Sequence, residues 1–140
     1  MHQIIYESRT GNTRKLAEAM AEELGTKALN VKSATIEKGD GVLFLGSGLY
    51  GQLPGKNMMK FIEDHDFVGR KVALFGTSSA GQGVQLKAMA EALKGKGAKV
   101  LGSYDCRGKV LPALNLINSG HPDAAEIAGA RKFAREMAHS

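Results

Sequence analysis

The regular alternation of short apolar runs with helical patterns is the feature that most constrains this chain. Strand-length apolar runs lie at residues 4–6, 28–31, 42–45, 72–75 and 100–104. A helical pattern follows the first run, with Leu16, Met20 and Leu24 at three-and-four spacing and Gly25 as a fitting stop. Strands that alternate with helices pair in parallel, so the pattern predicts an α/β fold with helices on both faces of one sheet.

Further helical patterns follow the later runs and complete the alternation. They predict a short helix near residues 58–62, a helix near 86–93 and a last helix from about Pro122 to Met137. The chain has 140 residues, a common size for one compact domain, and neither a repeat nor a linker interrupts the alternation. We therefore expect a single domain over residues 1–140.

The composition excludes several classes of protein. Cys106 is the only cysteine, which excludes an internal disulfide and favours a reducing compartment. No apolar run approaches the roughly 18 residues of a membrane span, and the first residues lack the basic flank of a signal peptide. We therefore expect a cytoplasmic protein without a membrane span.

The positive charge is concentrated in the second half of the chain. Residues 71–140 carry the whole net charge of +5, with a cluster at Lys94, Lys96 and Lys99. Nucleic-acid binding is not predicted, because neither interleaved aromatic residues nor a recognised motif accompanies the cluster. Two interpretations remain: a solvated helix end at which lysines offset the helix dipole, and a docking face for an acidic protein partner.

Three loops rich in Gly, Ser and Thr follow predicted strands, and open parallel sheets bind ligands at such strand ends. The first loop precedes an amphipathic helix and consists of Ser8, Arg9, Thr10, Gly11, Asn12 and Thr13. A helix N-terminus favours an anion, and hydroxyl groups can donate to phosphate oxygens. A helix cap alone needs one such residue, so this density of polar groups favours a phosphate site over a simple cap.

The spacing Ser8-x-Thr10-Gly11-Asn12-Thr13 after the first strand resembles the phosphate-binding loop of the flavodoxin family. It lacks the Gly-Lys-Ser/Thr of a Walker A loop and the three glycines of the dinucleotide fingerprint. The likeness extends over nearly the whole chain, as far as residues 120–123 before the last helix. The resemblance implies a flavodoxin-like doubly wound three-layer sandwich, with a five-stranded parallel sheet of order 2-1-3-4-5. It also implies a bound FMN, with its phosphate in the first loop.

The second loop supplies an aromatic residue beside a glycine. Its candidate residues are Ser47, Gly48, Leu49, Tyr50 and Gly51. The resemblance implies that Tyr50 stacks on the flavin and that Gly51 turns its peptide toward the reduced N5. Two alternatives stay open: Tyr50 is a half-exposed surface aromatic, or Leu49 is the apolar lid.

The third loop is assigned to the pyrimidine edge of the flavin by the same resemblance. Its candidate residues are Thr77, Ser78, Ser79, Gly81, Gln82 and Gly83. Better-known electron-transfer flavodoxins place a second aromatic and several acidic residues here, and this loop has neither. Negative surroundings disfavour an anionic hydroquinone, so the departure predicts a less reducing hydroquinone couple. Because this loop lies in the basic half of the chain, we also expect the excess positive charge to lie near the flavin edge.

Other reactive side chains give weaker signals. Cys106 precedes Arg107, which would lower the pKa of the thiol, but a lone cysteine after a buried strand is also typical of a small core residue. His65 lies between two acidic residues near a helix end, where a cap is favoured over a metal ligand, and no metal-ligand spacing occurs. The sequence also lacks a nucleophile elbow, which argues against a hydrolase.

Together these features predict an FMN-binding electron-transfer protein that shuttles one or two electrons between redox protein partners. No residue is a clear general acid or base, so substrate chemistry is not favoured. One alternative is an FMN-dependent reductase, or a reductase subunit, that acts on a small molecule such as a quinone or a tetrapyrrole. Another alternative is a non-enzymatic flavin-binding module. We expect a monomer or a weak dimer.

Overall fold

The computed structural model describes residues 1–78, 83–107 and 122–140. Its sheet has five parallel strands in the order β2-β1-β3-β4-β5, which confirms the predicted topology. The strands are β1 (Gln3–Glu7), β2 (Ala28–Asn30), β3 (Leu43–Gly48), β4 (Lys71–Ser78) and β5 (Lys99–Arg107). The helices are α1 (Asn12–Leu24), α2 (Lys56–Asp64), α3 (Val84–Gly95) and α4 (Ala124–Ala138).

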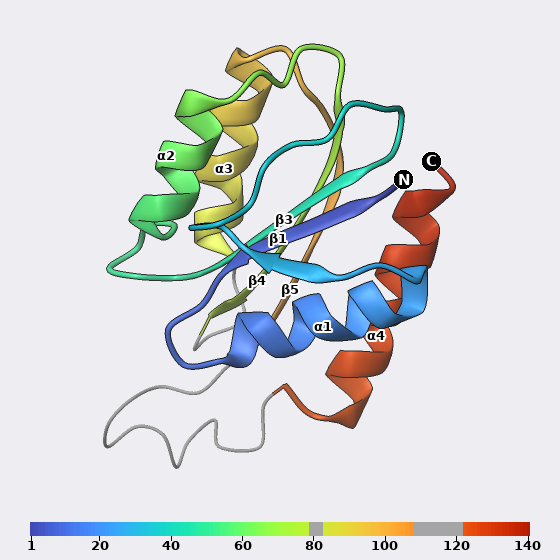
Figure 1. Ribbon diagram of the computed structural model, residues 1–140. Coiled ribbons are helices and arrows are strands. Elements are labelled where there is room, and N and C mark those ends of the chain that lie inside the picture. Colours follow the sequence, from blue (N-terminus) through green and yellow to red (C-terminus); the bar gives the residue numbers. More distant parts are fainter. Residues whose placement is uncertain (79–82, 108–121) are drawn as a thin grey trace.

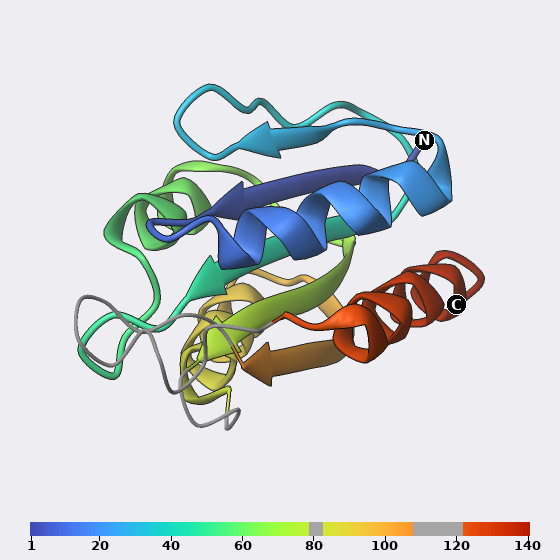
Figure 2. The ribbon, with the colours of Figure 1, turned by 90° about the horizontal axis from the view of Figure 1, so that it is seen from below.

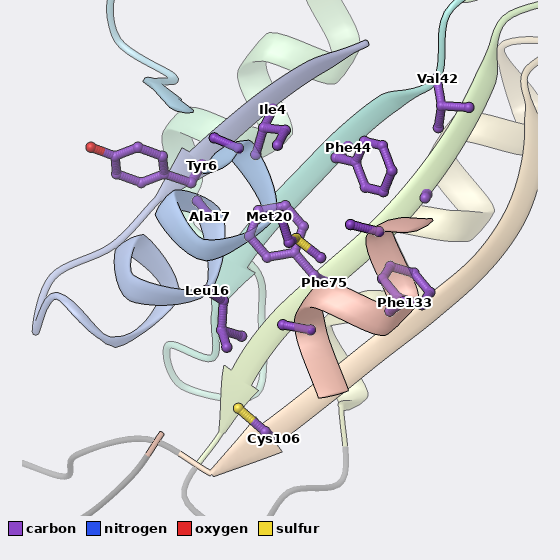
Figure 3. Packing of buried hydrophobic residues seen from close by; sticks show 14 residues of the cluster. Ile4, Tyr6, Leu16, Ala17, Met20, Val42, Phe44, Phe75, Cys106 and Phe133 are labelled. Atoms are coloured by element: carbon purple, nitrogen blue, oxygen red, sulfur yellow. The ribbon is translucent and has the colours of Figure 1, made fainter. Parts of the chain in front are cut away.

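The helices cover both faces of the sheet and give the molecule three layers (Figures 1 and 2). One face packs against α1 and α4, where the rings of Phe44 and Phe133 meet edge to face with their centroids 6.3 Å apart (Figure 3). The other face packs against α2 and α3, where Leu45, Met58 and Met89 are buried. Because the central strands are buried on both faces, their apolar residues form continuous runs instead of alternating with polar ones.

The helix α1 ends at Gly25, as the sequence predicts, and begins at Asn12, within the first polar loop. Gly11 and Gly25 flank it with left-handed φ angles of 88° and 69°, a conformation that glycine adopts at little cost. The N–H of Gly25 is directed to the carbonyl oxygens of Ala21 and Glu22, which closes the last turn. Local backbone chemistry therefore sets both ends of this helix.

Two strands extend further than their apolar runs predict. The sequence predicts loops at the ends of β3 and β4, but β3 continues through Gly48 and β4 through Ser78. The register pairs Gly48 with Thr77, so the parallel ladder carries the backbone through residues of low strand propensity. Gly46 has a packing role, because a Cβ at this position would collide with the ring of Phe75. The loops at this edge are therefore shorter than predicted.

Candidate functional site

The carboxyl edge of the sheet brings the three predicted loops together. The backbone N–H of Arg9 donates to the Tyr50 hydroxyl at 3.0 Å, which joins the first loop to the second. The hydroxyl groups of Thr13 and Thr77 form a buried hydrogen bond of 2.8 Å, which joins the start of α1 to the end of β4. Segments far apart in the sequence therefore form one continuous region.

Gln85, in the first turn of α3, ties two strand ends to this region. Its side chain is fully buried, and Nε2 donates to the backbone oxygens of Ser47 at 3.1 Å and Thr77 at 3.2 Å. Gly76 leaves space for the amide, since a Cβ there would lie 2.7 Å from Nε2. The sequence gives no signal for this role, because a polar residue in a first helical turn is usually exposed.

The first loop is a tight turn held by its own side chains. The N–H of Gly11 donates to Ser8 Oγ at 3.1 Å, and Asn12 Nδ2 donates to Thr10 Oγ1 at 2.8 Å. Asn12 and the threonine after it are buried, whereas the other loop residues are half-buried or exposed. The part of the loop open to a ligand is therefore residues 8–11.

Carboxylates lie at the starts of three helices. Glu7, at the end of β1, accepts the N–H of Met58 at 2.7 Å in the first turn of α2. Asp105, from β5, accepts the N–H of Gly83 immediately before α3. Asp123 caps α4 in a capping box with the residue three positions later. Each carboxylate satisfies backbone donors and offsets the positive end of its helix.

In the part of the chain that the structure describes, no carboxylate contact of this kind is found at the start of α1. Its first turn contains no acidic residue, and its N-cap Gly11 provides no side-chain cap. The basic residues Arg14 and Lys15 follow on the exposed surface of the helix. An anion placed at this helix start would therefore be attracted by the helix dipole without repulsion from a carboxylate of the same turn.

Tyr50 opens a two-residue hairpin turn in the second loop. Its backbone exchanges hydrogen bonds with Leu53 at 2.8 and 3.2 Å. Between them Gly51 and Gln52 have positive φ angles of 60° and 71°. Glycine adopts this conformation readily, but Gln52 is strained in it.

The ring of Tyr50 is half-buried and carries a cation over it. The Arg9 guanidinium lies over the ring, with Cζ 4.0 Å from the centroid, as in a cation–π contact. Burial raises the pKa of the Tyr50 hydroxyl. Tyr50 is thus the half-exposed aromatic that one interpretation predicts, Leu49 beside it is also half-buried, and stacking on a flavin stays a prediction.

The hydroxyl of Ser47 is engaged inside the protein. Ser47 is fully buried; its Oγ donates to the backbone oxygen of Gly48 at 2.8 Å and accepts the N–H of Gly55 at 2.9 Å. The side chain therefore holds the path from β3 to α2. Any contact of Ser47 with a ligand depends on its backbone.

The third loop is described at its two ends. Thr77 and Ser78 are buried residues of β4, and Gly83 is buried immediately before α3. The other predicted residues of this loop, Ser79, Gly81 and Gln82, lie outside the described residues.

Asp105 brings a carboxylate to the third loop. Its Oδ2 accepts the hydroxyl of Ser78 at 3.1 Å, and the N–H of Gly83 also donates to it. Burial raises the pKa of this carboxyl to about 6, although the two hydrogen bonds act in the opposite direction. The loop itself contains no acidic residue, but β5 brings the carboxylate of Asp105 to it from a distant part of the sequence.

Comparison with known proteins assigns the chain to a family. A family model described as a flavodoxin domain matches residues 3–117. The chain belongs to the flavodoxin family. A protein named flavodoxin from Clostridium beijerinckii is 31% identical, and the match covers 88% of this chain and 89% of that protein. An uncharacterised protein of Methanocaldococcus jannaschii is 28% identical, with 96% of this chain and 95% of that protein covered. The solved structure of a flavodoxin from the domain Archaea has a TM-score of 0.78 at 16% identity, covers 99% of this chain and 96% of its own, and shares the fold.

Cys106 of this flavodoxin-family chain is a core residue. It is 5% exposed and belongs to the cluster between the sheet, α1 and α4 (Figure 3). Burial raises the pKa of its thiol to about 12, and nearby carboxylates act in the same direction. The lowered pKa expected from Arg107 is therefore wrong, and the small-core-residue interpretation is supported. Gly108 and Lys109, which follow, lie outside the described residues.

The lysine cluster lies at the opposite edge of the sheet. Lys94 is in the last turn of α3, Lys96 follows the helix, and Lys99 begins β5. Lys96 Nζ donates to the backbone oxygen of Glu63 at 2.6 Å. The structure supports the helix-end interpretation for these three lysines, which therefore do not supply the positive charge expected near the third loop. The lysines follow the third loop closely in the sequence, but α3 lies between them and spans the sheet. Its two ends therefore lie at opposite edges.

His65 lies at the C-terminal end of α2. Its ring stacks on Phe61 with centroids 4.0 Å apart, and Nδ1 lies 2.8 Å from the Phe61 carbonyl oxygen. This position agrees with the predicted cap. Among the residues that the structure describes, no group of three or more His, Cys, Asp and Glu side chains could hold a metal ion.

Proposed function

We propose that the carboxyl edge of this sheet binds FMN, and the observation that carries the proposal is the start of α1, whose first turn has no acidic residue. The phosphate would lie at residues 8–13, where backbone N–H groups and hydroxyls can donate to its oxygens. The first turn of α1 contains no carboxylate that would repel it. Carboxylates of the protein occupy the starts of α2, α3 and α4.

The predicted contact residues divide by exposure. Those open to a ligand are residues 8–11, Leu49, Tyr50 and Gly51. We propose that these residues touch the flavin and that the buried ones, Asn12, Thr13, Ser47, Thr77 and Ser78, hold the loops in position. Bound FMN would supply one- and two-electron transfer, and the protein would orient it and shield it from water.

Electron transfer between redox proteins is the function that we favour, with a small-molecule reductase as the alternative. The carboxylate nearest the third loop, Asp105, already accepts two hydrogen bonds, so it is poorly placed as a general acid or base. We expect redox partners to dock at the carboxyl edge, because the proposed flavin lies there. The lysine cluster lies at the opposite edge, so we do not expect it to take part in docking. No helix in the described ranges is long and apolar enough to cross a membrane. A single domain, a monomer or weak dimer, and a cytoplasmic location stay predictions.

Flavin titration of the purified full chain tests the cofactor. FMN and riboflavin are titrated in parallel while flavin fluorescence is followed. We expect FMN to bind at least about 10-fold more tightly than riboflavin, because only FMN carries a phosphate for charge-assisted hydrogen bonds. Equal affinities would contradict the proposal that residues 8–13 bind the phosphate. Failure to bind either flavin would contradict the proposal that the cofactor is FMN.

Reduction assays separate the two functions. The FMN-loaded protein is mixed with NADH or NADPH alone, and then together with a separate flavoprotein reductase. An electron shuttle is reduced only through the second protein. Direct oxidation of the nicotinamide by the isolated chain would favour the reductase.

A further inference from the structure

Asp105 lies where the end of β5 meets the third loop. Its Oδ2 accepts the hydroxyl of Ser78, the last residue of β4, at 3.1 Å. The same carboxylate accepts the N–H of Gly83, the residue that precedes α3. A single side chain from the edge strand therefore contacts both described ends of the connection between β4 and α3.

The packing around this contact is close. Gly83 has a left-handed φ of 62°, and a Cβ built on it would lie 3.1 Å from the Cβ of Asp105. A side chain at Gly83 would therefore be strained and would press on the carboxylate.

The described residues satisfy only one oxygen of this carboxylate. Oδ1 of Asp105 is buried and has no hydrogen-bond partner among the described residues. On the α3 side of β5 the carboxylate borders a half-open pocket of about 240 Å³, lined by the apolar Leu74, Leu86 and Val100 and by the polar Lys87 and Ser103. An unsatisfied buried oxygen destabilises the fold, and such costs are typical of positions with a functional role.

We propose that Asp105 is a positioning residue of the flavin site, which holds Ser78 and Gly83 where the third loop needs them to meet the flavin. The inference rests on the proposed function. The ionised carboxylate holds its two donors more strongly than the neutral acid, because charge-assisted hydrogen bonds are about twice as strong as neutral ones. Flavin affinity therefore depends on the protonation of Asp105.

The surroundings of Asp105 set the pH range of this dependence. Burial raises the pKa of its carboxyl to about 6, and Glu126 of α4 acts in the same direction. Lys87 lines the same pocket from α3. Cys106, the next residue on β5, has its pKa raised to about 12 and stays neutral between pH 5 and 8. His65 lies at the opposite edge of the sheet, at the end of α2.

Riboflavin binding to the full chain at about pH 5 and about pH 7.5 tests the proposal, since Asp105 changes charge between these values. Riboflavin is the probe because the phosphate of FMN itself titrates near pH 6. We expect the wild-type Kd to be about 5-fold larger at the acidic pH, because the hydrogen bonds from Ser78 and Gly83 to Asp105 are then neutral instead of charge-assisted. We call this pair of hydrogen bonds the clamp. Asp105→Asn keeps an acceptor oxygen without the charge, so its Kd stays near the acidic wild-type value at both pH values.

Two further variants isolate the clamp. Ser78→Ala removes one donor, so we expect it to weaken riboflavin binding at the higher pH and to reduce the additional effect of Asp105→Asn. Asp66→Asn is the matched control: Asp66 also accepts a loop N–H, from Val68 at 3.0 Å, but before β4 at the opposite edge. This control should keep the wild-type pH dependence. Circular dichroism at both pH values verifies that each variant is folded, and Ser78→Ala carries the test if Asp105→Asn does not fold.

The outcomes separate this inference from the proposed function. If wild-type protein binds neither flavin at either pH, the proposed function fails. If it binds flavin but Asp105→Asn shows the same pH dependence as wild type, the positioning role is overturned and FMN binding stands. Tighter riboflavin binding on acidification, lost in Asp105→Asn, would overturn the clamp as described.

Discussion

The helices α1 and α4 pack side by side on one face of the sheet, but their N-termini are built differently. α4 starts with a capping box in which Asp123 accepts the N–H of Glu126 at 2.8 Å and the Glu126 side chain accepts the N–H of Asp123 at 3.0 Å. α1 starts at Gly11, which has no side-chain cap, and its first turn has no acidic residue. The bodies of the two helices are joined by ion pairs such as Arg131 with Glu22 at 3.0 Å.

The difference shows how one fold divides stability from binding. A helix start closed by a carboxylate of the chain has satisfied donors and repels a second anion, so it does not offer an anion site. A start without one leaves its dipole available to a ligand. The carboxylates of Glu7 and Asp105 lie in the same way at the starts of α2 and α3, and among the described residues no carboxylate contact lies at the start of α1.

A carboxylate introduced at the start of α1 should have the largest effect on FMN affinity. Thr10→Asp places a carboxylate beside the proposed phosphate, and we expect FMN binding to weaken by about 100-fold through charge repulsion and lost anion stabilisation. Riboflavin binding should change far less, because riboflavin carries no charge there. Fluorescence titrations of both flavins measure the effect, with Thr10→Asn as the uncharged control. Equal losses for both flavins would show that Thr10 is not near the phosphate.

Removing the carboxylate at the start of α2 should lower the stability of the protein and should change its affinity for FMN only slightly. Glu7→Ala leaves the N–H of Met58 without its partner at 2.7 Å, and we expect the free energy of unfolding to fall by about 1–2 kcal/mol. Urea denaturation at neutral pH measures the loss. Glu7→Gln keeps an acceptor oxygen and should lose less than Glu7→Ala. A large rise in the FMN Kd with unchanged stability would place Glu7 in the binding site instead.

The carboxylate at the start of α3 makes the stability of the apo-protein depend on pH. The pKa of Asp105 rises from 3.8 to about 6 on folding, so the folded state binds its proton more tightly than the unfolded state. The stabilisation is complete below about pH 4 and is lost as the pH rises through about 6. We expect this loss to be about 1 kcal/mol, since the group is partly solvated, and to disappear in Asp105→Asn. Urea denaturation across this range, compared with wild type, detects it; an identical slope in the variant would contradict the raised pKa.

Removing the cation at the open edge should have the smallest effect. Arg9→Gln removes the guanidinium over Tyr50 and keeps the backbone N–H that bonds the Tyr50 hydroxyl. The positive charge favours a reduced, anionic flavin, so we expect its loss to make the hydroquinone couple more reducing by about 0.5 kcal/mol. A redox titration of the FMN-bound protein measures the shift, and Arg9→Lys should retain most of the wild-type potential. A shift toward less reducing values would exclude Arg9 as a source of positive charge at the flavin.

Local chemistry explains which parts were predictable. The stripe of α1 and its flanking glycines predict its limits, and the apolar runs predict all five strands. The predicted ends of β3 and β4 were too early, because pairing with neighbours keeps Gly48 and Ser78 in the ladder against their own preference. The three loops were assigned to one edge correctly, since every strand of a parallel sheet ends there.

The sequence by itself determined the alternating elements, the sheet topology and the dense group of small polar residues after β1, because these depend on periodicity and on neighbours along the chain. Tertiary structure alone decided which carboxylates meet which helix starts: Glu7 reaches α2 some 51 positions later, and Asp105 reaches back to Ser78 across 27. It also buried Cys106 and sent the lysine cluster to the far edge. Electrostatic interactions depend on distance in space, and only the folded chain defines that distance.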